Sequence, residues 1–312
     1  MTAADVTEAG IPAADGIYNT VPEDLYHADR GSLSVSGAKL LLPPSCPAKF
    51  RYQMDNPRKP KREFDFGHLA HRLILGKGAE IAVLDPAVHG LKKDGTVADS
   101  PRATCGWKEA EAEARRRGQV PVHIDDFRKA EAMATKVLTD PECGPWFTEG
   151  QAEVSGYAAD PTGVRLRGRA DWITGDLIVD VKTSVTANPA ELERKFWQFG
   201  YFMQDAWYRD LFGAATGTTF GFRFVVVEKE PPHIVTVLAY DQEAIDEGRR
   251  INRQAIDLYH RCHEADSWPD YTEGTVPLSL PYWALRDRDR AIYNEAADLE
   301  RNWDDFFSTG DN

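Results

Sequence analysis

Two neighbouring apolar segments, each carrying an acidic side chain, constrain the fold of this 312-residue chain most strongly. The first ends in Gly168-Arg-Ala-Asp171-Trp, and the second reads Ile178-Val-Asp180-Val-Lys182-Thr183. Successive side chains of a strand alternate between its faces, so Asp180 and Lys182 are expected on one face. The opposite face, toward a core, is expected to hold Leu177, Val179 and Val181. The pattern predicts two strands of a largely buried sheet.

Periodicity and turn residues extend this prediction to a mixed sheet with helices beside it. Asp160-Pro-Thr-Gly163 and Thr174-Gly-Asp176 separate three strands, and Asn188-Pro189 begins a long helix. The expected central elements are strands at 152–158, 164–173 and 177–183, a helix at 189–212, and strands at 220–228 and 234–240. The predicted class is therefore α/β (or α+β), with a central mixed sheet flanked by helices.

The rest of the chain is expected to be helical or irregular. Helices are expected at 64–75, 107–117, 125–138, 242–263 and 287–306, and residues 15–30 and 84–105 are expected to be irregular. We divide the chain into a flexible N-terminal segment (1–30), a main domain (31–240) and an acidic helical extension (241–312) packed on the same domain.

The charge distribution allows nucleic acid as a partner despite a net charge of −13. A strongly acidic protein repels phosphates on average. Residues 241–312, however, hold 8 Lys/Arg and 17 Asp/Glu, a net charge of −9, which leaves −4 for the first 240 residues. Basic clusters lie at 58–62 and 115–117, and each is either part of a DNA-binding channel or an ordinary solvated face.

Several features are typical of a cytoplasmic protein. The chain has no run of about 18 apolar residues, so no transmembrane helix is expected. Residues 1–14 lack the apolar stretch of a signal peptide. The four cysteines, Cys46, Cys105, Cys143 and Cys262, are scattered without a C-x-x-C pair. Reduced thiols are expected, and a zinc site is not.

The acidic residues of the two strands indicate a metal site. A carboxylate such as Asp180 inside an apolar run is costly unless it is paired or binds a metal. Together with Asp171 it offers the hard oxygen ligands that suit Mg²⁺ or Mn²⁺, with Lys182 beside a phosphodiester. A plain ion pair between Asp180 and Lys182 is the alternative.

A stripe of arginines precedes the first aspartate. Alternation predicts that Arg165, Arg167, Arg169 and Asp171 share one face of the strand. The opposite face is expected to hold Leu166, Gly168, Ala170 and Trp172. The stripe is interpreted either as a polar face that meets phosphates or as a solvent-exposed face of the strand.

Four further residues are candidates for the same site. Glu153 begins the first strand and can reach the site from a neighbouring strand, or be solvated there. His71 lies on the helix expected at 64–75, where a lone histidine is more often packed or exposed than a ligand. Gln204 and Tyr208 lie four residues apart on one helix face, which either serves the site or packs on the sheet.

Five motifs follow one another in an order that is known from a nuclease family. They are Leu33-Ser-Val-Ser-Gly-Ala-Lys-Leu-Leu-Leu with Ser45-Cys-Pro47, Gly67-His-Leu-Ala-His71, Ala152-Glu-Val154, Gly168-Arg-Ala-Asp171 with Ile178-Val-Asp-Val-Lys-Thr183, and Tyr201-Phe-Met-Gln204-Asp-Ala-Trp-Tyr208. Over about residues 30–240 the chain resembles the RecE-type exonucleases of the PD-(D/E)xK nuclease superfamily, close to the RecB-type nuclease domains. The resemblance implies the restriction-endonuclease-like core of that superfamily.

The resemblance also implies the ligands of a metal ion. His71, Asp171 and Asp180 would bind Mg²⁺ or Mn²⁺, and the Val181 carbonyl would add a ligand. Glu153 would support the metal or the water.

The remaining motif residues would act on the water and the DNA. By this resemblance, Lys182 would position or activate the attacking water, or stabilise charge on the phosphate. Gln204 and Tyr208 would orient the lysine and the DNA strand.

The activity that the resemblance implies is metal-dependent digestion of linear double-stranded DNA from an end. The product would be single strand for recombination, passed to an annealing protein. Related proteins are typical of phages and prophages, which would place this one in the host cytoplasm, and they often form homo-oligomeric rings that thread DNA.

Three alternatives stay open at this point. The first is an endonuclease or nickase of the same fold. The second is a catalytically inactive DNA-binding accessory protein of recombination, and the third is a phage structural or interaction protein that uses its acidic C-terminal region.

Overall fold

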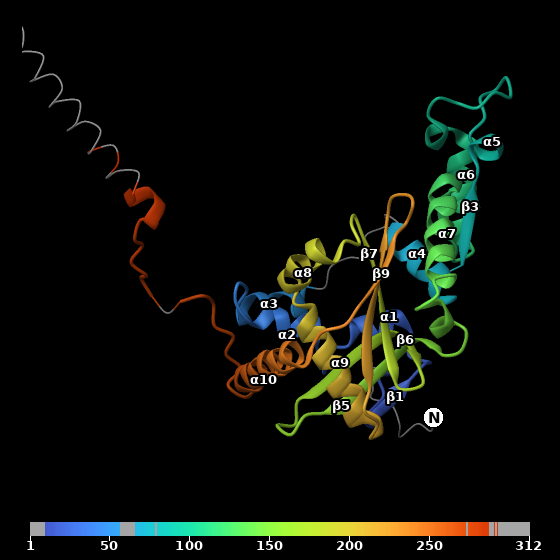
Figure 1. Cartoon of the computed structure of the whole chain (residues 1–312). Coiled ribbons are helices and arrows are strands. Elements are labelled where there is room, and N and C mark those ends of the chain that lie inside the picture. Colours follow the sequence, from blue (N-terminus) through green and yellow to red (C-terminus); the bar gives the residue numbers. More distant parts are fainter. Residues whose placement is uncertain are drawn as a thin grey trace, which may run out of the picture. The chain divides into compact units, whose positions relative to one another are not determined.

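The computed structural model describes residues 10–56, 66–78, 80–272, 274–286, 290 and 292 (Figure 1). The chain forms two compact units, Met1–Asp270 and Tyr271–Asn312. The helix expected at 287–306 lies almost entirely outside the described residues, as does the basic cluster at 58–62. Among the described helices, none combines the length and the apolar character that crossing a membrane requires.

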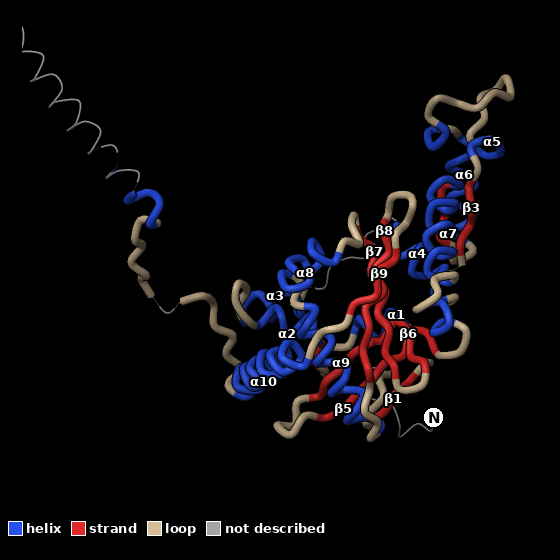
Figure 2. Tube along the Cα trace, in the orientation of Figure 1, coloured by secondary structure: helices blue, strands red, loops and turns tan. Residues whose placement is uncertain are grey.

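A mixed sheet of seven strands forms the centre of the first unit (Figure 2). Its strands are β1 (Gly16–Tyr18), β2 (Leu33–Ser34), β5 (Gln151–Ala159), β6 (Arg165–Thr174), β7 (Leu177–Ser184), β8 (Gly221–Glu228) and β9 (Val235–Leu238). The order is β1-β5-β6-β7-β8-β9, and β2 also pairs with β6. The pairs β7–β8 and β2–β6 are parallel and the others are antiparallel. The predicted class, a mixed sheet flanked by helices, is confirmed.

Two large hydrophobic cores hold most of the helices on the sheet, and a smaller one joins Tyr26 of α1 (Glu23–Ala28) to Tyr157 of β5. The first core joins it to α2 (Val35–Leu41), α3 (Pro47–Asp55), α8 (Pro189–Gln198), α9 (Tyr201–Thr216) and α10 (Gln242–Glu264). The second core joins Val179 and Val181 of β7 to α4 (Phe66–Leu75) and α7 (Ile124–Leu138). Leu177, Val179 and Val181 thus face one core, as predicted, and Ile178 packs in the other.

The expected helix at 189–212 is wrong in one respect, because it is two helices. Gly200 adopts a left-handed conformation (φ 61°) between α8 and α9. A side chain there is disfavoured by its φ, and a Cβ would also lie 3.2 Å from Cε of Lys39. A single glycine is tolerated inside a helix at a cost of about 1 kcal/mol, so Gly200 alone did not predict the break.

Two stretches expected to be irregular are partly regular. Residues 15–30 contain β1 and α1 (Glu23–Ala28), and residues 84–105 contain the short helix α5 (Pro86–His89). An additional parallel pair, β3 (Ile81–Leu84) and β4 (Val120–His123), lies beside α6 (Cys105–Arg116) and α7. Each strand of this pair has only four residues, and their pairing depends on a partner far along the chain.

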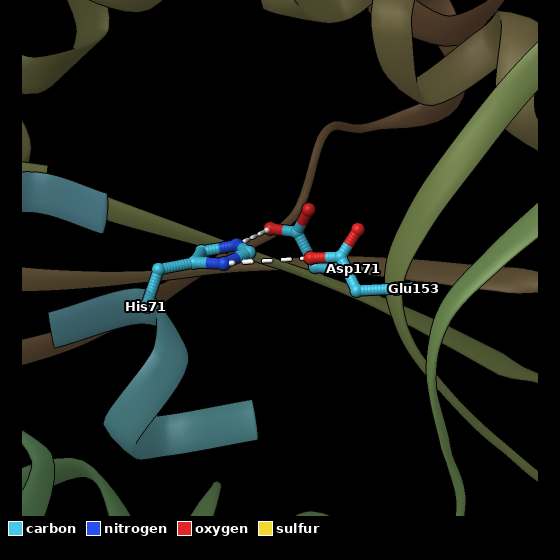
Figure 3. A group of neighbouring side chains, drawn as sticks. All are labelled: His71, Glu153 and Asp171. Atoms are coloured by element: carbon cyan, nitrogen blue, oxygen red, sulfur yellow. Dashed lines mark ion pairs between the residues drawn. The ribbon is translucent and has the colours of Figure 1, made fainter. Parts of the chain in front are cut away.

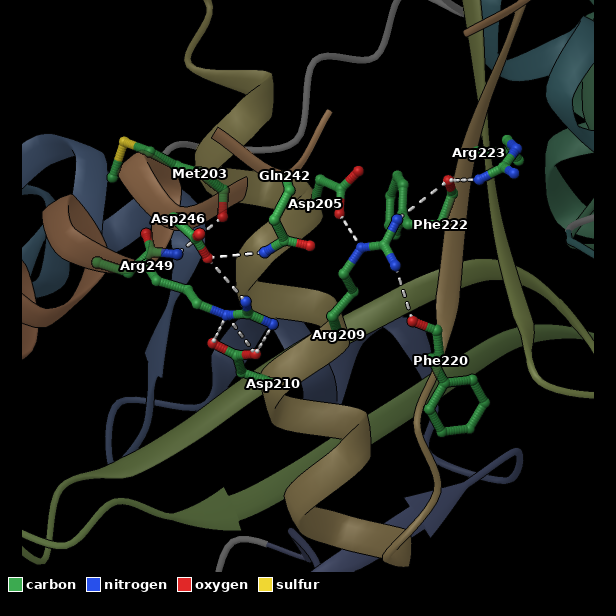
Figure 4. Close-up of polar contacts among 11 residues, drawn as sticks. Met203, Asp205, Arg209, Asp210, Phe220, Phe222, Arg223, Gln242, Asp246 and Arg249 are labelled. Carbon is green, nitrogen blue, oxygen red and sulfur yellow. Dashed lines mark hydrogen bonds and ion pairs between the residues drawn. The ribbon is translucent and has the colours of Figure 1, made fainter. Parts of the chain in front are cut away.

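Polar contacts also fix α9 against its neighbours (Figure 4). Arg209 donates to Asp205 on the same helix and to the Phe220 carbonyl just before β8, at 2.9 Å. Burial raises the pKa of Asp205, while the hydrogen bond from Arg209 lowers it. Arg249 of α10 pairs with Asp210 of α9 at 3.0 Å, so charged groups join the helices at their exposed rim.

Gly248 lies where α10 crosses α9. A Cβ there would lie 2.4 Å from the backbone oxygen of Phe202, closer than atoms can approach. Beside it, Asn252 Nδ2 donates to the Met203 carbonyl at 2.9 Å. The close contact of the two helices therefore depends on glycine at position 248, which has no side chain.

We expect Gly248→Ala to lower the free energy of unfolding by about 1–3 kcal/mol, the usual cost of overpacking. In an open helix the same change would be stabilising by up to about 1 kcal/mol. Denaturant unfolding measures the difference, with the exposed Gln254→Ala on the same helix as a control expected within about 0.5 kcal/mol of the native chain. An unchanged or raised stability of Gly248→Ala would contradict this packing.

Candidate active site

The candidate site lies where strand β7 separates from β6. The two strands pair only at Trp172–Thr174, and continuing their register would place Asp171 opposite Asp180. Instead, the carboxylate of Asp171 accepts a hydrogen bond from the Val181 N–H at 2.8 Å. A side chain thus replaces the backbone partner at the point where the strands diverge.

Tyr208 of α9 satisfies the backbone that the separation leaves free. Its hydroxyl accepts from the Arg169 N–H at 3.3 Å and donates to the Arg169 carbonyl at 2.8 Å. Nearby, Trp207 Nε1 donates to the Arg167 carbonyl at 3.0 Å. Because buried backbone groups need partners, these aromatic side chains allow a gap inside the sheet.

The pair Glu153–Asp171 interrupts the pairing on the other edge of β6. Strands β5 and β6 pair on both sides of it, but these two residues do not pair. Glu153 has a positive φ of 55°, which is strained for a side chain of this type. The interruption places a glutamate and an aspartate beside each other at the gap.

The side chains of β6 change faces at this interruption. Ala170 packs in the first core and Trp172 in the second, although regular alternation would put both on one face. The expectation that they share a face is therefore wrong. The reason is local: the left-handed backbone of Glu153 shifts the alternation by one residue at the pair, without inserting a residue.

His71 meets the two carboxylates from helix α4 (Figure 3). Its Nε2 lies 2.8 Å from Asp171 Oδ2, and its Nδ1 lies 3.6 Å from Glu153 Oε1. Leu69 and Ala70, both buried in the second core, fix this part of α4 against the sheet. The three side chains offer ligand atoms that all lie within 4.8 Å of one another.

The electrostatics of this cluster favour positive charge. Burial lowers the pKa of His71, but Asp171, by charge and hydrogen bond, with Glu153 and Asp180, raises it to about 9. Burial raises the pKa of Asp171, and His71 and Lys182 outweigh that effect, so the net shift is downward. Burial, followed by the charge of Asp171, raises the pKa of Glu153.

A second group lies on the other side of the gap, toward α9. Lys182 Nζ lies 2.5 Å from Asp180 Oδ2, and Gln204 Nε2 donates to Asp180 Oδ1 at 2.5 Å. The ammonium group of Lys182 also lies 4.9 Å from the centroid of the Tyr201 ring, a cation–π distance. The buried carboxylate is therefore held from two sides, and the lysine is held by a carboxylate and a ring.

The titration of this second group is shifted by burial and by its partners. Burial raises the pKa of Asp180 to about 6, with Lys182 lowering it and Asp171 raising it. Burial lowers the pKa of Lys182, but Asp180 and Asp171 outweigh burial and raise it. Lys182 is therefore a cation at neutral pH.

The structure gathers the predicted residues into two groups that differ from the predicted grouping. His71 and Asp171 lie together with Glu153, which was expected only in support of the metal. Asp180 lies with Lys182 and Gln204 instead. Tyr208 bonds to the backbone of β6 and not to the lysine, and the Val181 carbonyl remains a predicted ligand.

The arginine stripe is covered, so it is neither the solvent-exposed face nor the open face toward phosphates that the sequence suggested. Arg165 donates to the carbonyls of Pro12 and Ala14, at 2.9 and 2.7 Å. Arg167 donates to the carbonyls of Tyr26 and Asp29, at 2.7 and 2.9 Å. The stripe anchors the N-terminal segment through these carbonyls and through ion pairs of Arg165 with Asp15 and of Arg167 with Asp29.

Arg169, two residues after Arg167 on β6, is covered in the same way. It donates to Ser155 Oγ at 3.0 Å and to the Val21 carbonyl, and it lies 4.0 Å from Glu153 Oε2. It is the one arginine of the stripe with a described contact to the candidate metal cluster.

Lys39 of α2 is a basic residue that the sequence did not single out. Its Nζ donates to the Phe199 carbonyl at 2.8 Å and lies 5.4 Å from the centroid of the Tyr201 ring, which Lys182 also contacts. Burial, and then the charge of Lys182, lower its pKa to about 8. The one signal in the sequence was a lysine between Ala38 and Leu40 in an otherwise apolar short helix.

The cluster of His71, Glu153 and Asp171 fits a divalent cation. Its two carboxylates are donors that Mg²⁺ and Mn²⁺ accept, and its imidazole is a donor to transition metals. The same negative charge that raises the pKa of His71 attracts a cation. The donor set and its electrostatics therefore agree.

Comparisons with known proteins agree with this fold. The sequence pattern of a family described as "PDDEXK-like domain of unknown function (DUF3799)" matches residues 34–276. No curated protein matches the chain. A putative exonuclease from Eubacterium rectale is similar in structure, with a TM-score of 0.55 and 14% identity over 85% of this chain and 98% of that one. This likeness shows a shared fold.

Two further solved structures give lower scores. A phage-related exonuclease from Haemophilus somnus 129PT has a TM-score of 0.31 and 14% identity, over 64% of this chain and 95% of that one. An alkaline exonuclease from Laribacter hongkongensis has a TM-score of 0.26 and 15% identity, over 64% and 96%.

We expect Tyr208→Phe to lower the free energy of unfolding by about 1–3 kcal/mol, because it leaves two buried backbone groups of Arg169 without a partner. Tyr157→Phe is the matched control. The Tyr157 hydroxyl is also buried but has no hydrogen-bond partner among the described residues, so its loss leaves no group unpaired and should leave stability unchanged or raise it. Equal effects in denaturant unfolding would contradict this account of the gap.

We expect Glu153→Gly to be more stable than Glu153→Ala by about 1 kcal/mol, because only glycine tolerates the positive φ without strain. Both variants lose the carboxylate, so the difference isolates the backbone. At Ser155 on the same strand, the order should reverse, since glycine in a regular strand costs about 0.5–1 kcal/mol. Alanine being the better residue at both positions would show that Glu153 is not strained.

Proposed function

This chain belongs to the family of PDDEXK-like domains of unknown function (DUF3799), and from that premise we propose that it is a metal-dependent nuclease. One observation carries the proposal: a cation-attracting cluster of His71, Glu153 and Asp171 lies across a gap in the sheet from Asp180 and Lys182. Carboxylates and a lysine around one point suit hydrolysis of a phosphodiester.

The proposed metal is Mg²⁺ or Mn²⁺, held by His71 and Asp171 with Glu153, and by Asp180 and the Val181 carbonyl as the resemblance implies. When bound, such an ion supplies charge neutralisation at a phosphate oxygen and a lowered pKa of nearby water. For His71 to serve as a ligand, it must lose the proton that its neighbours favour.

The protein's own residues supply charge and orientation. Lys182 is held as a cation against Asp180, where it can stabilise charge on the phosphate or position the attacking water. Gln204 fixes the second oxygen of Asp180, and Tyr201 fixes the direction of the lysine. Tyr208 bonds to the backbone of β6 and so stabilises this strand at the edge of the gap.

The finer assignment is an exonuclease that digests linear double-stranded DNA from an end and leaves single strand for recombination. It is supported by the order of the sequence motifs and by the fold shared with a putative exonuclease. An annealing protein as partner, a homo-oligomeric ring, a location in the (host) cytoplasm, and a catalytic domain at 31–240 with an acidic extension at 241–312 belong to the same proposal.

Two alternatives give different products or none. An endonuclease or nickase of this fold would cut a covalently closed circle, which an exonuclease leaves intact. An inactive DNA-binding accessory protein would bind DNA without cutting it. The presence of Asp171, Asp180 and Lys182 together favours an active enzyme.

We expect the full chain to shorten end-labelled linear duplex DNA in the presence of Mg²⁺ or Mn²⁺, and to leave a closed circle intact. Asp180→Ala and Lys182→Ala should each reduce the rate by at least about 100-fold, the scale on which removal of a charge-stabilising group acts. Lys182→Ala should reduce the rate more than it reduces DNA binding. Gel analysis of the labelled ends over time measures the rates, and a gel shift with EDTA present measures DNA binding.

A chelator is the control for metal dependence, and Gln254→Ala is the control for handling of variants. Full cleavage by Lys182→Ala would remove that residue from the mechanism. Cutting of the closed circle would favour the endonuclease, and absence of cleavage with both metals would favour the accessory protein.

A further inference from the structure

An apolar groove of about 990 Å³ adjoins the candidate active site on the side of α9. It lies among α2 and the following prolines, the junction of α8 and α9, and α10. Lys39, Trp197, Phe199, Met203 and Ile251 are among the residues that line it. None of these residues belongs to the metal cluster.

Two large aromatic side chains of this groove are exposed to solvent. Trp197 is 70% exposed and Phe199 is 60% exposed, at the end of α8. Their backbones are fixed, because Gly200 donates to the Trp197 carbonyl at 2.9 Å and Lys39 to the Phe199 carbonyl at 2.8 Å. Exposed rings on a fixed backbone are a stacking surface.

The groove is continuous with the Asp180–Lys182 pair through Tyr201. The Phe199 and Tyr201 rings lie 5.6 Å apart, centroid to centroid. The same Tyr201 ring contacts Lys39 on the groove side and Lys182 in the site. A chain of aromatic and basic side chains therefore leads from the exposed rings to the residue that is proposed to meet the phosphate.

The chemistry of the groove selects its occupant. Lys39 and Arg194 can meet phosphates, but Glu193 and Glu247 also line the groove, so attraction of phosphates alone is weak there. Affinity must then come from the rings, and stacking on rings requires bases that are free. The bases of a duplex already stack on one another, whereas those of a single strand are available.

We propose that this groove binds single-stranded DNA, with Trp197 and Phe199 stacking on bases of the strand whose backbone reaches Lys182. The inference rests on the proposed nuclease function, because that function places a DNA strand at Lys182. The strand leaves the site past Tyr201 and Lys39, and its bases lie on the exposed rings.

The test measures binding of a short fluorescent single-stranded oligodeoxynucleotide to the full chain, by anisotropy, with EDTA present to prevent cleavage. Trp197→Ala and Phe199→Ala should each weaken binding about tenfold, the effect of losing one stacked base. Trp197→Tyr should recover most of the loss. Tyr52→Ala is the matched control: Tyr52 is 68% exposed, does not line the groove, and should bind as the native chain does.

An abasic oligonucleotide of the same length separates stacking from contacts with phosphates. The native chain should bind it about 100-fold more weakly than the ordinary strand, because both stacked bases are lost, whereas Trp197→Ala, which keeps Phe199, should prefer the ordinary strand only about tenfold. Native-like binding by both alanine variants would overturn the proposal. An equal loss of affinity for the ordinary and the abasic strand in the variants would also overturn the proposal. Thermal unfolding confirms that each variant is folded.

Cleavage of linear duplex, measured on the same preparations, separates this proposal from the function on which it rests. Cleavage together with ring-independent binding would refute the groove alone. Ring-dependent binding without cleavage in Mg²⁺ or Mn²⁺ would refute the nuclease and leave the groove as the strand site of a DNA-binding protein.

Discussion

Strand β7 leaves β6 inside a buried sheet, and every part of the candidate site follows from how the freed backbone is satisfied. Unpaired N–H and C=O groups in such a place are too costly to leave alone. Asp171 takes the N–H of Val181, and Tyr208 takes both backbone groups of Arg169. The resulting gap lets α4 and α9, which pack in different cores, bring side chains to one place.

The two sides of the gap have different electrostatic characters. On the side of α4, an imidazole sits between two carboxylates, which is an environment for a cation. On the side of α9, a buried carboxylate holds a lysine in place with the help of an amide and a ring. Asp171 influences both groups, since its negative charge raises the pKa of His71 and of Lys182. The side of α4 therefore suits a cation, and the side of α9 already presents one in Lys182.

Much of the fold and part of the site were predictable from the sequence. The alternation around Asp180 predicted the side chains of β7 correctly, because regular strands obey a period of two. The same rule failed at Trp172, since a left-handed residue on the neighbouring strand shifts the alternation. It also gave no sign that the N-terminal segment covers the arginines. Lys39 was not predicted as a site residue because its contact with the Tyr201 ring joins positions 162 residues apart in the chain.

The arginine stripe of β6 holds the N-terminal segment mainly by its carbonyl oxygens, at Pro12, Ala14, Val21, Tyr26 and Asp29. Every amino acid carries a carbonyl, so most substitutions in that segment leave the donors of β6 with an acceptor. Arg165, Arg167 and Arg169 have no such freedom, because no other side chain presents the same fork of donors. The strand therefore depends on the identity of its arginines, whereas the segment depends on side-chain identity chiefly at Asp15, Tyr26 and Asp29, whose side chains also meet the arginines.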